Sequence, residues 1–492
     1  MVAKGKTLAN LGLTTARASH LLVQGLAVDS REVRPGYLFA ALPGARVHGA
    51  EFAEYACRQG ASAILTDPQG ADFIARTLLE HKAEICVVDD PRQALAGAAA
   101  LFFGAQPKVM VAVTGTNGKT SVSTFCRQIW TQIGLSAVNL GTTGVEGAWS
   151  APLNHTTPEP ITLHRALAQA AEAGVTHAAM EASSHGLDQK RLDGVVLSVA
   201  GFTNFTQDHL DYHATFDAYF AAKAGLFDRV LGPQGIAVIN VDDAKAADLL
   251  KGCAARGQST ITVGRGEADF QILGQKYDST GQDILFSWQG DNHQVRVPLV
   301  GGFQGENLML AAAMVLAAGG EAEEVFASLK AVRSVRGRME LAATRSNGAS
   351  VYVDYAHTPD AVATALRALR PHVMGRLVVV LGAGGDRDPG KRVLMGQAAA
   401  EFADVVFVTD DNPRSEDPAD IRAMVMAGVA DATDVADRAE AILRAVDCLQ
   451  SGDTLLIAGK GHESGQIIGD DVFPFDDVEQ ASIAVAALEG EY

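Results

Sequence analysis

Short, continuous apolar runs alternate with amphipathic stretches along most of the chain, and this alternation predicts an α/β protein. In the centre, β-branched runs predict strands at 109–114, 177–180 and 236–240. Amphipathic stretches between them predict helices at 162–173 and 216–230. Because strands separated by helices form βαβ units, we expect a mostly parallel sheet here.

The same pattern restarts after residue 338 and predicts a second, doubly wound domain. Its predicted strands are 351–355, 377–382, 405–409 and 454–459, and its predicted helices are 359–369 and 392–402. Before residue 107, shorter apolar runs with Gly and Pro punctuation, at 37–42 and 63–66, predict a small α/β unit. A length of 492 residues suggests about three domains. We therefore predict domains at 1–107, 108–335 and 336–492.

Composition and charge narrow the possible functions. Hydrophobic residues make up 48% of the chain and charged residues 20%, as in ordinary globular proteins. The net charge of -18 would repel a polyanionic backbone, which argues against a nucleic-acid partner. The five cysteines form no CxxC pair, so we expect reduced thiols. Apolar stretches such as 94–105 are too short to span a bilayer, and no signal-peptide core is found at the start. We expect a cytoplasmic protein without a membrane partner.

A glycine-rich loop at 114–120, TGTNGKT, lies between a predicted strand and a predicted helix. Backbone amides and the helix dipole at such a junction bind anions, here the phosphates of ATP. Lys119 would contact the outer phosphates, and the Thr120 hydroxyl would bind magnesium. Val113 occupies the first glycine position of the standard GxxxxGK[ST] pattern, and a glycine turn with a solvated lysine is the alternative. The full candidate set is Gly115, Thr116, Asn117, Gly118, Lys119, Thr120 and Ser121.

Charged residues gather directly after the predicted central strands, where open α/β sheets bind their ligands. Glu181 follows the strand at 177–180 and is a candidate magnesium ligand. The loop at 203–213 contains two Asp and two His residues, a density suited to metal or proton chemistry, and His209 is its main candidate. In the alternative, the other three only cap the next helix: Asp208, Asp211 and His213.

Three further charged segments have less specific meanings on their own. Lys223 lies in an amphipathic helix and could simply extend its amine to solvent from an apolar face. The segments 354–360 and 384–392 both end predicted strands of the last domain. Two charged strand ends in succession favour a ligand site there.

Taken together, nine ordered motifs identify the chain as similar to the Mur ligases, in particular to the branch that adds diaminopimelate. The motifs are TGTNGKT, EASSHGLDQKR, TNFTQDHLDYH, AAKAGLF, GRMEL, DYAHTPD, GGDRDPGKR, DDNPR and GKGHE. The resemblance extends from Val28 to Glu463. It implies a uridine-binding amino-terminal domain, a central P-loop ATPase domain and a Rossmann-like carboxyl-terminal domain.

The resemblance also implies roles for individual residues. The UDP group would contact Val28, Ser30, His48, Gly49 and Ala50. The muramoyl dipeptide would contact His155, Thr156, Thr157, Ser183, Gln189 and Arg191. ATP, or the contacts made when the carboxyl-terminal domain closes over the substrates, would involve Asn307, Arg338, Asp354 and His357. The incoming amino acid would contact Arg387, Asp411, Asn412, Pro413, Arg414, Gly459 and Glu463.

Two magnesium ions and a modified lysine complete the site that the resemblance implies. The implied metal ligands are Thr120, Glu181, His209 and Lys223, the last carrying carbon dioxide as N6-carboxylysine. The catalytic groups would be Lys119, Lys223 and His209. The chain departs from the family at His155 and Gln304, where Asn is common, and at Arg336, within a Val-Arg-Gly-Arg segment that replaces Pro-Gly-Arg.

The implied reaction is ATP-dependent amide formation. The D-glutamyl carboxylate of UDP-N-acetylmuramoyl-L-alanyl-D-glutamate would attack the γ-phosphate, and the amine of meso-2,6-diaminopimelate would displace phosphate from the acyl phosphate. A folylpolyglutamate synthetase and a lysine-adding Mur ligase are alternatives, against which the segment 411–414 argues. Two further alternatives are a P-loop regulatory or motor NTPase and a non-enzymatic nucleotide-gated module. Among these proteins, only the ligase would need both the UDP-dipeptide and an amino acid to release ADP. We expect a monomer.

Overall fold

The computed structural model describes residues 5–15, 18–44, 47–77, 82–206, 208 and 212–490. The chain divides into two compact units, one of Met1–Val263 with Leu310–Val325 and one of Gly264–Met309 with Phe326–Tyr492. Both units contain a parallel sheet covered by helices, which confirms the predicted α/β class. Among the described residues, no helix has the length and apolar character needed to cross a membrane.

The first unit begins with a parallel sheet of four strands in the order β3-β4-β5-β6. The strands are β3 (Gly25–Ala27), β4 (Tyr37–Ala40), β5 (Ala63–Thr66) and β6 (Glu84–Val87). The helix α3 (Pro91–Phe103) contributes to the core on one face, and α1 (Ala53–Arg58) and α2 (Pro68–Thr77) contribute to the core on the other. Short β1 (Lys6–Thr7) pairs with β2 (Leu22–Val23). The small α/β unit expected from the apolar runs is therefore present.

The rest of the first unit is built on a parallel sheet in the order β13-β12-β11-β7-β10-β8. Its strands are β7 (Val109–Thr114), β8 (Ala137–Gly141), β10 (His177–Glu181), β11 (Val199–Phe202), β12 (Ile236–Asn240) and β13 (Ser259–Gly264). Short β9 (Gly144–Gly147) pairs antiparallel with β8. The chain crosses from one side of β7 to the other between β10 and β11, so the carboxyl end of β7 lies at a topological switch point.

Helices cover both faces of this sheet. They are α4 (Lys119–Gln132), α5 (Pro160–Glu172), α6 (Ser184–Asp188), α7 (Phe216–Gly225), α8 (Ala246–Ala255) and the last turns of α9 (Gly302–Ala317). The helix expected at 162–173 begins earlier because Glu159 caps it and Pro160 occupies its first turn. The helix expected over 216–230 differs in its last turn, where Leu226–Val230 widens into a π-helical turn that buries Leu226, Phe227 and Val230.

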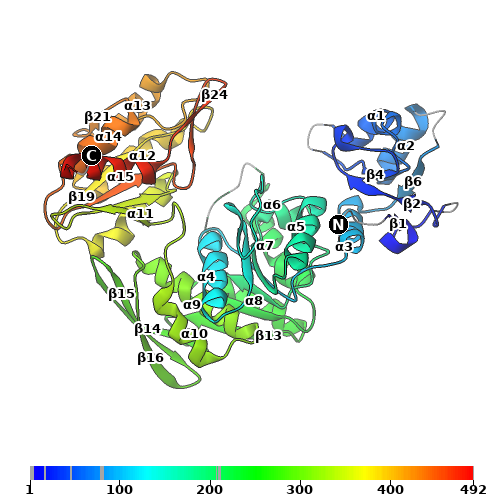
Figure 1. The fold of residues 1–492 in the computed structure, drawn as a ribbon, viewed down its shortest axis with the longest axis horizontal. Helices are drawn as coiled ribbons and strands as arrows, with labels where there is room; N and C mark the ends of the chain where they lie inside the picture. The colour runs from blue at the N-terminus through cyan, green and yellow to red at the C-terminus, as the bar shows by residue number, and fades with distance from the viewer. Residues whose placement is uncertain are drawn as a thin grey trace. The chain divides into compact units, whose positions relative to one another are not determined.

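The second unit contains three antiparallel strands that the apolar pattern had not indicated. They are β14 (Phe270–Asp278), β15 (Gly281–Trp288) and β16 (Asp291–Val297), a long ribbon in Figure 1. Polar residues alternate with apolar ones here, because one face of the ribbon is exposed. The short helix α10 (Ala322–Ser328) follows α9 in sequence.

The carboxyl-terminal sheet has the order β17-β18-β22-β19-β20-β21 and is parallel except for β17. Its strands are β17 (Glu340–Thr344), β18 (Ser350–Asp354), β19 (Leu377–Leu381), β20 (Val405–Val408), β21 (Thr433–Asp434) and β22 (Thr454–Ala458). Helices α11 (Pro359–Leu369), α12 (Gly390–Phe402) and α13 (Pro418–Met426) pack on one face, and α14 (Arg438–Asp447) and α15 (Asp477–Glu489) pack on the other. The predicted doubly wound domain is confirmed, with a hairpin of β23 (Gly465–Ile468) and β24 (Asp471–Pro474) added.

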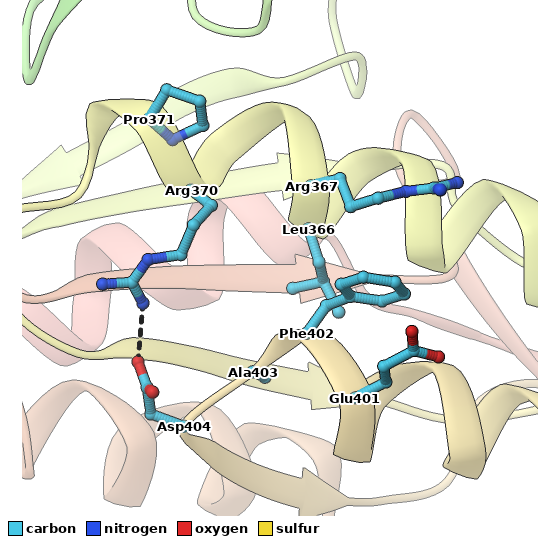
Figure 2. A pocket seen from close by; sticks show the side chains of 8 residues that line it. All are labelled: Leu366, Arg367, Arg370, Pro371, Glu401, Phe402, Ala403 and Asp404. Carbon is cyan, nitrogen blue, oxygen red and sulfur yellow. Dashed lines mark hydrogen bonds and ion pairs between the residues drawn. The ribbon is translucent and has the colours of Figure 1, made fainter.

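A hollow of about 420 Å³ lies between α11 and α12, and Figure 2 shows the side chains that line it. Arg370 and Asp404 form an ion pair of 2.7 Å at its edge, and the amide of Leu377, the first residue of β19, donates to Asp404. The hollow therefore lies at the amino ends of the strands. The charged strand ends that predicted a ligand site lie at the opposite edge of the same sheet.

Candidate active site

The glycine-rich loop joins β7 to α4 at the switch point of the central sheet. Gly115 has a φ of 148°, and a Cβ atom there would lie 1.8 Å from the hydroxyl of Thr203, so only glycine fits. Gly118, with a φ of 86°, caps α4. The loop is anchored because the amide of Asn117 donates to the side chain of Asn204 at 2.9 Å and Thr203 donates to the carbonyl of Asn117 at 2.6 Å.

Lys119 folds back over this loop. Its Nζ donates to the carbonyls of Gly115 at 3.0 Å and Thr116 at 2.8 Å. Thr120 and Ser121 are buried in the first turn of α4. An ammonium group beside a helix amino terminus is a favourable environment for an anion, and phosphate binding at this loop stays a prediction.

Glu181 ends β10 beside the phosphate loop and is only 2% exposed. The Thr120 hydroxyl donates to Glu181 Oε2 at 3.0 Å, and the amide of Thr142 donates to Oε1 at 2.8 Å. Gly141 makes room for the carboxylate, since a Cβ atom there would lie 1.9 Å from Oε1. Thr142 was missed from sequence, although its Gly-Thr-Thr segment follows a strand as the other candidates do. These oxygens are of the kind that magnesium prefers.

Lys223 points inward from α7 and is 2% exposed, so the alternative in which it extends to solvent is wrong. Its Nζ donates to Gly115 O at 2.6 Å and lies 4.6 Å from the centre of the Tyr219 ring. Burial, reinforced by the charge of Lys119 and opposed by Asp208, lowers the pKa of Lys223 well below its ordinary value. The amine is therefore held close to the phosphate loop in an environment that favours its uncharged form.

The loop at 203–213 is only partly covered by the structure. His209 and Asp211 lie outside the described residues. The described residues Asp208 and His213 do not cap α7, because Thr215 does so by accepting from the amide of Ala218 at 3.0 Å. The ring of His213 is buried and lies 5.2 Å from that of Tyr219.

The residues expected to hold the muramoyl dipeptide lie around the end of β10. The hydroxyl of Thr157 donates to the carbonyl of Glu181 at 2.9 Å and accepts from the amide of Ser183 at 3.0 Å. Thr156 bonds to Thr142 through their hydroxyls at 3.0 Å. The structure thus joins three of these predicted residues to the end of β10.

Arg191 and Gln189 lie next to this group. Arg191 donates to the carbonyl of Thr157 at 2.5 Å and to the side-chain oxygen of Gln189 at 2.8 Å. Burial lowers the pKa of Arg191, which nevertheless remains a cation at neutral pH. His155, directly before Thr156 in the chain, is exposed. A half-buried guanidinium here is suited to an anionic group.

The residues expected to contact UDP lie at the carboxyl ends of β3, β4 and β5. His48 Nδ1 accepts from the amide of Ala50 at 3.0 Å, so its Nε2 carries the proton and donates to Asp67 at 3.1 Å. Gly49 packs closely, since a Cβ atom there would lie 2.7 Å from a backbone nitrogen. Val28 and Ser30 follow β3 and are half-buried.

In the second unit, the residues expected to meet ATP form a separate group. Asp354 ends β18 and accepts from the amide of Met339 at 2.8 Å, and burial raises the pKa of Asp354 against the opposing charge of Arg338. Gln304 donates to the carbonyl of Arg338 at 3.4 Å and accepts from Asn307 at 3.3 Å. The departure to glutamine therefore keeps Asn307 and the backbone of Arg338 linked.

Aromatic contacts orient the exposed part of this group. The guanidinium of Arg338 lies 4.7 Å from the centre of the Tyr355 ring. His357 Nδ1 bonds to the carbonyl of Tyr355 at 2.8 Å. Arg336, the third departure from the family pattern, forms an ion pair of 2.6 Å with Asp476.

The residues expected to bind the amino acid meet at the carboxyl ends of β19, β20 and β22. Arg414 has a φ of 52°, and its Nη1 donates to the carbonyl of Gly385 at 2.7 Å. Gly385 is required there because a Cβ atom would lie 1.8 Å from the carbonyl oxygen of Pro413. Likewise, a Cβ atom at Gly459 would lie 2.6 Å from a carboxylate oxygen of Asp411.

Asn412, Glu463 and Arg387 complete this group. Asn412 donates to Glu463 Oε2 at 2.9 Å, and Arg387 is exposed on the neighbouring loop. The segment is also the turn that its sequence suggests, since Asp417 caps α13 by accepting from the amide of Ala419 at 2.9 Å. All seven predicted residues therefore gather at one edge of the sheet, within the second unit.

An ion pair between a buried arginine and a half-exposed glutamate, missed from sequence, holds the two arginine-bearing loops together. Arg392, 1% exposed, binds Glu416 through two hydrogen bonds of 2.8 Å. Glu416 in turn accepts from the amide of Asp386 at 2.5 Å. An arginine at 1% exposure requires a partner, but the motif Gly-Lys-Arg gave no sign that this arginine is buried.

Comparison with known proteins matches three family descriptions in order. "Mur ligase family, catalytic domain" matches residues 22–103, "Mur ligase middle domain" matches 113–315, and "Mur ligase, glutamate ligase domain" matches 337–461. The UDP-N-acetylmuramoyl-L-alanyl-D-glutamate--2,6-diaminopimelate ligase of Caulobacter vibrioides is 46% identical over 480 residues, covering 96% of this chain and 97% of that protein.

Two solved structures are also similar. A UDP-N-acetylmuramoyl-L-alanyl-D-glutamate--2,6-diaminopimelate ligase superposes with a TM-score of 0.74 at 34% identity, covering 99% of both chains. The MurF ligase of Thermotoga maritima, solved in complex with ADP, has a TM-score of 0.61 at 18% identity and covers 95% of this chain and 98% of that one, which shows a shared fold.

Proposed function

Because this chain belongs to the Mur ligase family, we propose that it catalyses the ATP-dependent joining of meso-2,6-diaminopimelate to UDP-N-acetylmuramoyl-L-alanyl-D-glutamate. The products are the UDP-linked tripeptide, ADP and phosphate, and the reaction is a step in peptidoglycan precursor synthesis. Full-length similarity to the diaminopimelate ligase of Caulobacter vibrioides is the observation that carries this proposal.

The first chemical step brings two anions together, the D-glutamyl carboxylate and the γ-phosphate of ATP. Their repulsion must be neutralised and their orientation fixed before an acyl phosphate can form. Lys119, bent over the loop at 2.8 Å from the Thr116 carbonyl, is placed to contact the phosphates. We propose that Arg191 and Ser183 hold the substrate's own anionic groups, supported by the half-buried guanidinium of Arg191 near the end of β10.

Magnesium fits the oxygen atoms at the end of β10. Thr120 and Glu181, in contact at 3.0 Å, would hold one ion, with His209 as a further proposed ligand. When bound, magnesium would offset the negative charge of the phosphates. Replacing Glu181 by Gln would keep the volume and remove the charge, so a raised magnesium requirement is expected. Isothermal titration of magnesium with a non-hydrolysable ATP analogue would measure that change without turnover.

We also propose that Lys223 carries carbon dioxide as N6-carboxylysine. Its amine is 2% exposed beside the phosphate loop, and a lowered pKa favours the uncharged amine that reacts with carbon dioxide. The carbamate would replace a cation by an anionic oxygen ligand for a second magnesium ion. Carbon-13 NMR with labelled bicarbonate should show one carbamate signal that Lys223→Ala abolishes and Lys245→Ala, at a more exposed lysine, retains. An unlabelled parent protein would refute the proposal.

For the incoming amino acid, Arg414 and Glu463 support diaminopimelate. Diaminopimelate differs from lysine by one distal carboxylate, which a guanidinium can bind through two parallel hydrogen bonds. We propose that Glu463 binds the distal ammonium group and that Arg387, Asp411 and Gly459 complete the site. Glutamate, the amino acid that a folylpolyglutamate synthetase adds, has a distal carboxylate but no distal ammonium group, so it would leave Glu463 unpaired.

An amino-acid panel tests the whole proposal. ADP release should require both the UDP-muramoyl dipeptide and meso-diaminopimelate, whereas a regulatory NTPase would release ADP without either, and a binding module would release none. Equal activity with L-lysine and diaminopimelate would refute the proposed specificity for diaminopimelate, while the assignment as a ligase would stand.

The remaining predictions extend the same proposal. We keep the domain limits 1–107, 108–335 and 336–492, supported by three family matches in the same order. We expect the protein to act as a monomer in the cytoplasm, without nucleic-acid or membrane partners. Size-exclusion chromatography with light scattering would test the monomer.

A further inference from the structure

A buried lysine that no assignment above uses lies under the amino-acid site. Lys460 follows β22 in the segment Gly-Lys-Gly, and its side chain is 0% exposed. The glycines on both sides have positive φ angles, 119° at Gly459 and 55° at Gly461. These left-handed positions turn the backbone so that the lysine points into the protein, and a buried charge of this kind needs specific partners.

The partners of Lys460 are Asn412 and Glu463, both expected at the amino-acid site. Its Nζ lies 2.9 Å from Asn412 Oδ1 and 3.5 Å from Glu463 Oε2. Glu463 itself is 33% exposed, so its carboxylate is reachable from outside while Lys460 is not. The lysine can therefore act on a ligand only through these two residues.

Hydrogen-bond chemistry fixes how the Asn412 amide must be oriented. The Lys460 ammonium and the amide of Ile467, at 3.0 Å, are both donors, and they meet the same terminal atom of Asn412. That atom must be the oxygen, which leaves the nitrogen to donate to Glu463 Oε2 at 2.9 Å. A reversed amide would place donors against donors and oxygen against the carboxylate.

The same network reaches Arg414. Ile467, whose amide donates to Asn412, accepts from the amide of Arg414 through its carbonyl at 3.1 Å. Asn412 is thus linked on one side to Glu463 and on the other, through Ile467, to the backbone of Arg414. Lys460 therefore holds Asn412, the residue that links Glu463 to the backbone of Arg414.

We propose that Lys460 is a positioning residue that sets the stereochemical selectivity of this site, by holding Asn412 so that Glu463 and Arg414 keep a fixed relative placement. This inference rests on the proposed function. The distal carbon of diaminopimelate has four different substituents: hydrogen, carboxylate, ammonium and the carbon chain. When the carboxylate, the ammonium and the chain each have a fixed place, only one configuration at that carbon satisfies all three.

The test compares meso-diaminopimelate with the LL isomer, which differs only in the configuration of the distal carbon. In Lys460→Met, we expect the KM for meso-diaminopimelate to rise roughly tenfold to a hundredfold, because a displaced Glu463 leaves the ammonium poorly paired. The preference for meso over LL in kcat/KM should fall by at least about tenfold, and kcat at saturating meso-diaminopimelate should change little. The KM values for ATP and the UDP-dipeptide should stay within about twofold.

A second variant and a matched control accompany this measurement. Asn412→Asp is isosteric and keeps an acceptor for Lys460 and Ile467, but it removes the donor to Glu463, so it should also reduce the preference. Lys330→Met removes an exposed lysine of the same unit and should leave all constants at parental values.

The possible outcomes separate this inference from the function on which it rests. Parental selectivity in Lys460→Met, or an equal rise of all three KM values with unchanged selectivity, would overturn the positioning role and leave the ligase assignment intact. If Lys460→Met does not fold, unchanged selectivity in Asn412→Asp overturns it. A parent enzyme that uses neither isomer refutes the proposed function, and the inference with it.

Discussion

Replacing Arg414 by alanine is the most direct test of the proposed specificity. Its Nη1 donates to the carbonyl of Gly385 at 2.7 Å, which restrains the guanidinium, and the Nε–Nη2 edge can then act as a two-donor fork. Alanine retains a Cβ atom, so the backbone at φ 52° is equally unfavourable in parent and variant. The change therefore removes the fork without relieving backbone strain.

The expected loss follows from the strength of hydrogen bonds to charged groups. One such bond contributes about 1.5–3 kcal/mol, and Arg414 is only half-buried, so solvent screening keeps the combined contribution of the two bonds of the fork within about this range. Because roughly 1.4 kcal/mol corresponds to a tenfold rate difference, kcat/KM for meso-diaminopimelate should fall about tenfold to a hundredfold. L-lysine has no distal carboxylate, so its kcat/KM should change by less than about threefold.

Phosphate release measured with both amino acids provides the assay. Arg370→Ala is the matched control, because Arg370 pairs with Asp404 at the opposite edge of the same sheet and should affect neither amino acid (Figure 2). An equal fall for both amino acids in Arg414→Ala would refute the carboxylate clamp. Equal preference in the parent enzyme would refute the diaminopimelate assignment and leave the ligase reaction standing.

Three further predictions concern the first unit. Lys119→Ala and Glu181→Ala should each lower kcat by at least about a hundredfold while circular dichroism stays parental, and near-normal turnover in either would contradict the site. Gly115→Ala should abolish ATP binding measured by calorimetry, since its Cβ atom would lie 1.8 Å from Thr203, and unchanged affinity would contradict the loop geometry. Burial lowers the pKa of His164 from 6.5 to about 4, so its neutral form contributes stability that is fully present above pH 6.5 and is lost as pH falls towards 4. By linkage this loss in the free energy of unfolding reaches roughly 3 kcal/mol. Urea denaturation from pH 7 to 4 should therefore show a shallower decline in the free energy of unfolding for His164→Gln than for the parent. Parallel declines in the two proteins would contradict this prediction.

Much of the fold could be predicted because its signals are local. The strand at 236–240 and the helix at 359–369 have the predicted bounds, since a buried strand and an amphipathic helix each carry their own hydrophobic period. The strands at 270–297 were missed because an exposed antiparallel ribbon mixes polar and apolar positions. The turn at 226–230 differs because tertiary packing, not local propensity, selects a π-helical turn.

For the candidate site, the residue types were evident from the sequence and their partners were not. A glycine loop between strand and helix indicated phosphate binding, and charged strand ends indicated the ligand edge, since parallel strands place their carboxyl ends together. The roles of individual residues, including His209 outside the described part, remain predictions. The catalytic role predicted for Lys223 came from the family resemblance, because periodicity alone favoured a lysine that extends to solvent.

The sequence by itself determined the buried parallel strands and most amphipathic helices, the place of the glycine-rich loop and the family that the chain resembles, because these depend on periodicity and on contiguous motifs. Only the tertiary structure decided which side chains meet: Thr142 with Glu181, Lys223 with Gly115, and Lys460 with Asn412. These pairs are separated by 39, 108 and 48 residues, and their contact follows from strand order and register. No local pattern encodes such a distance, because it is set by how the packed strands bring remote loops to one edge of a sheet.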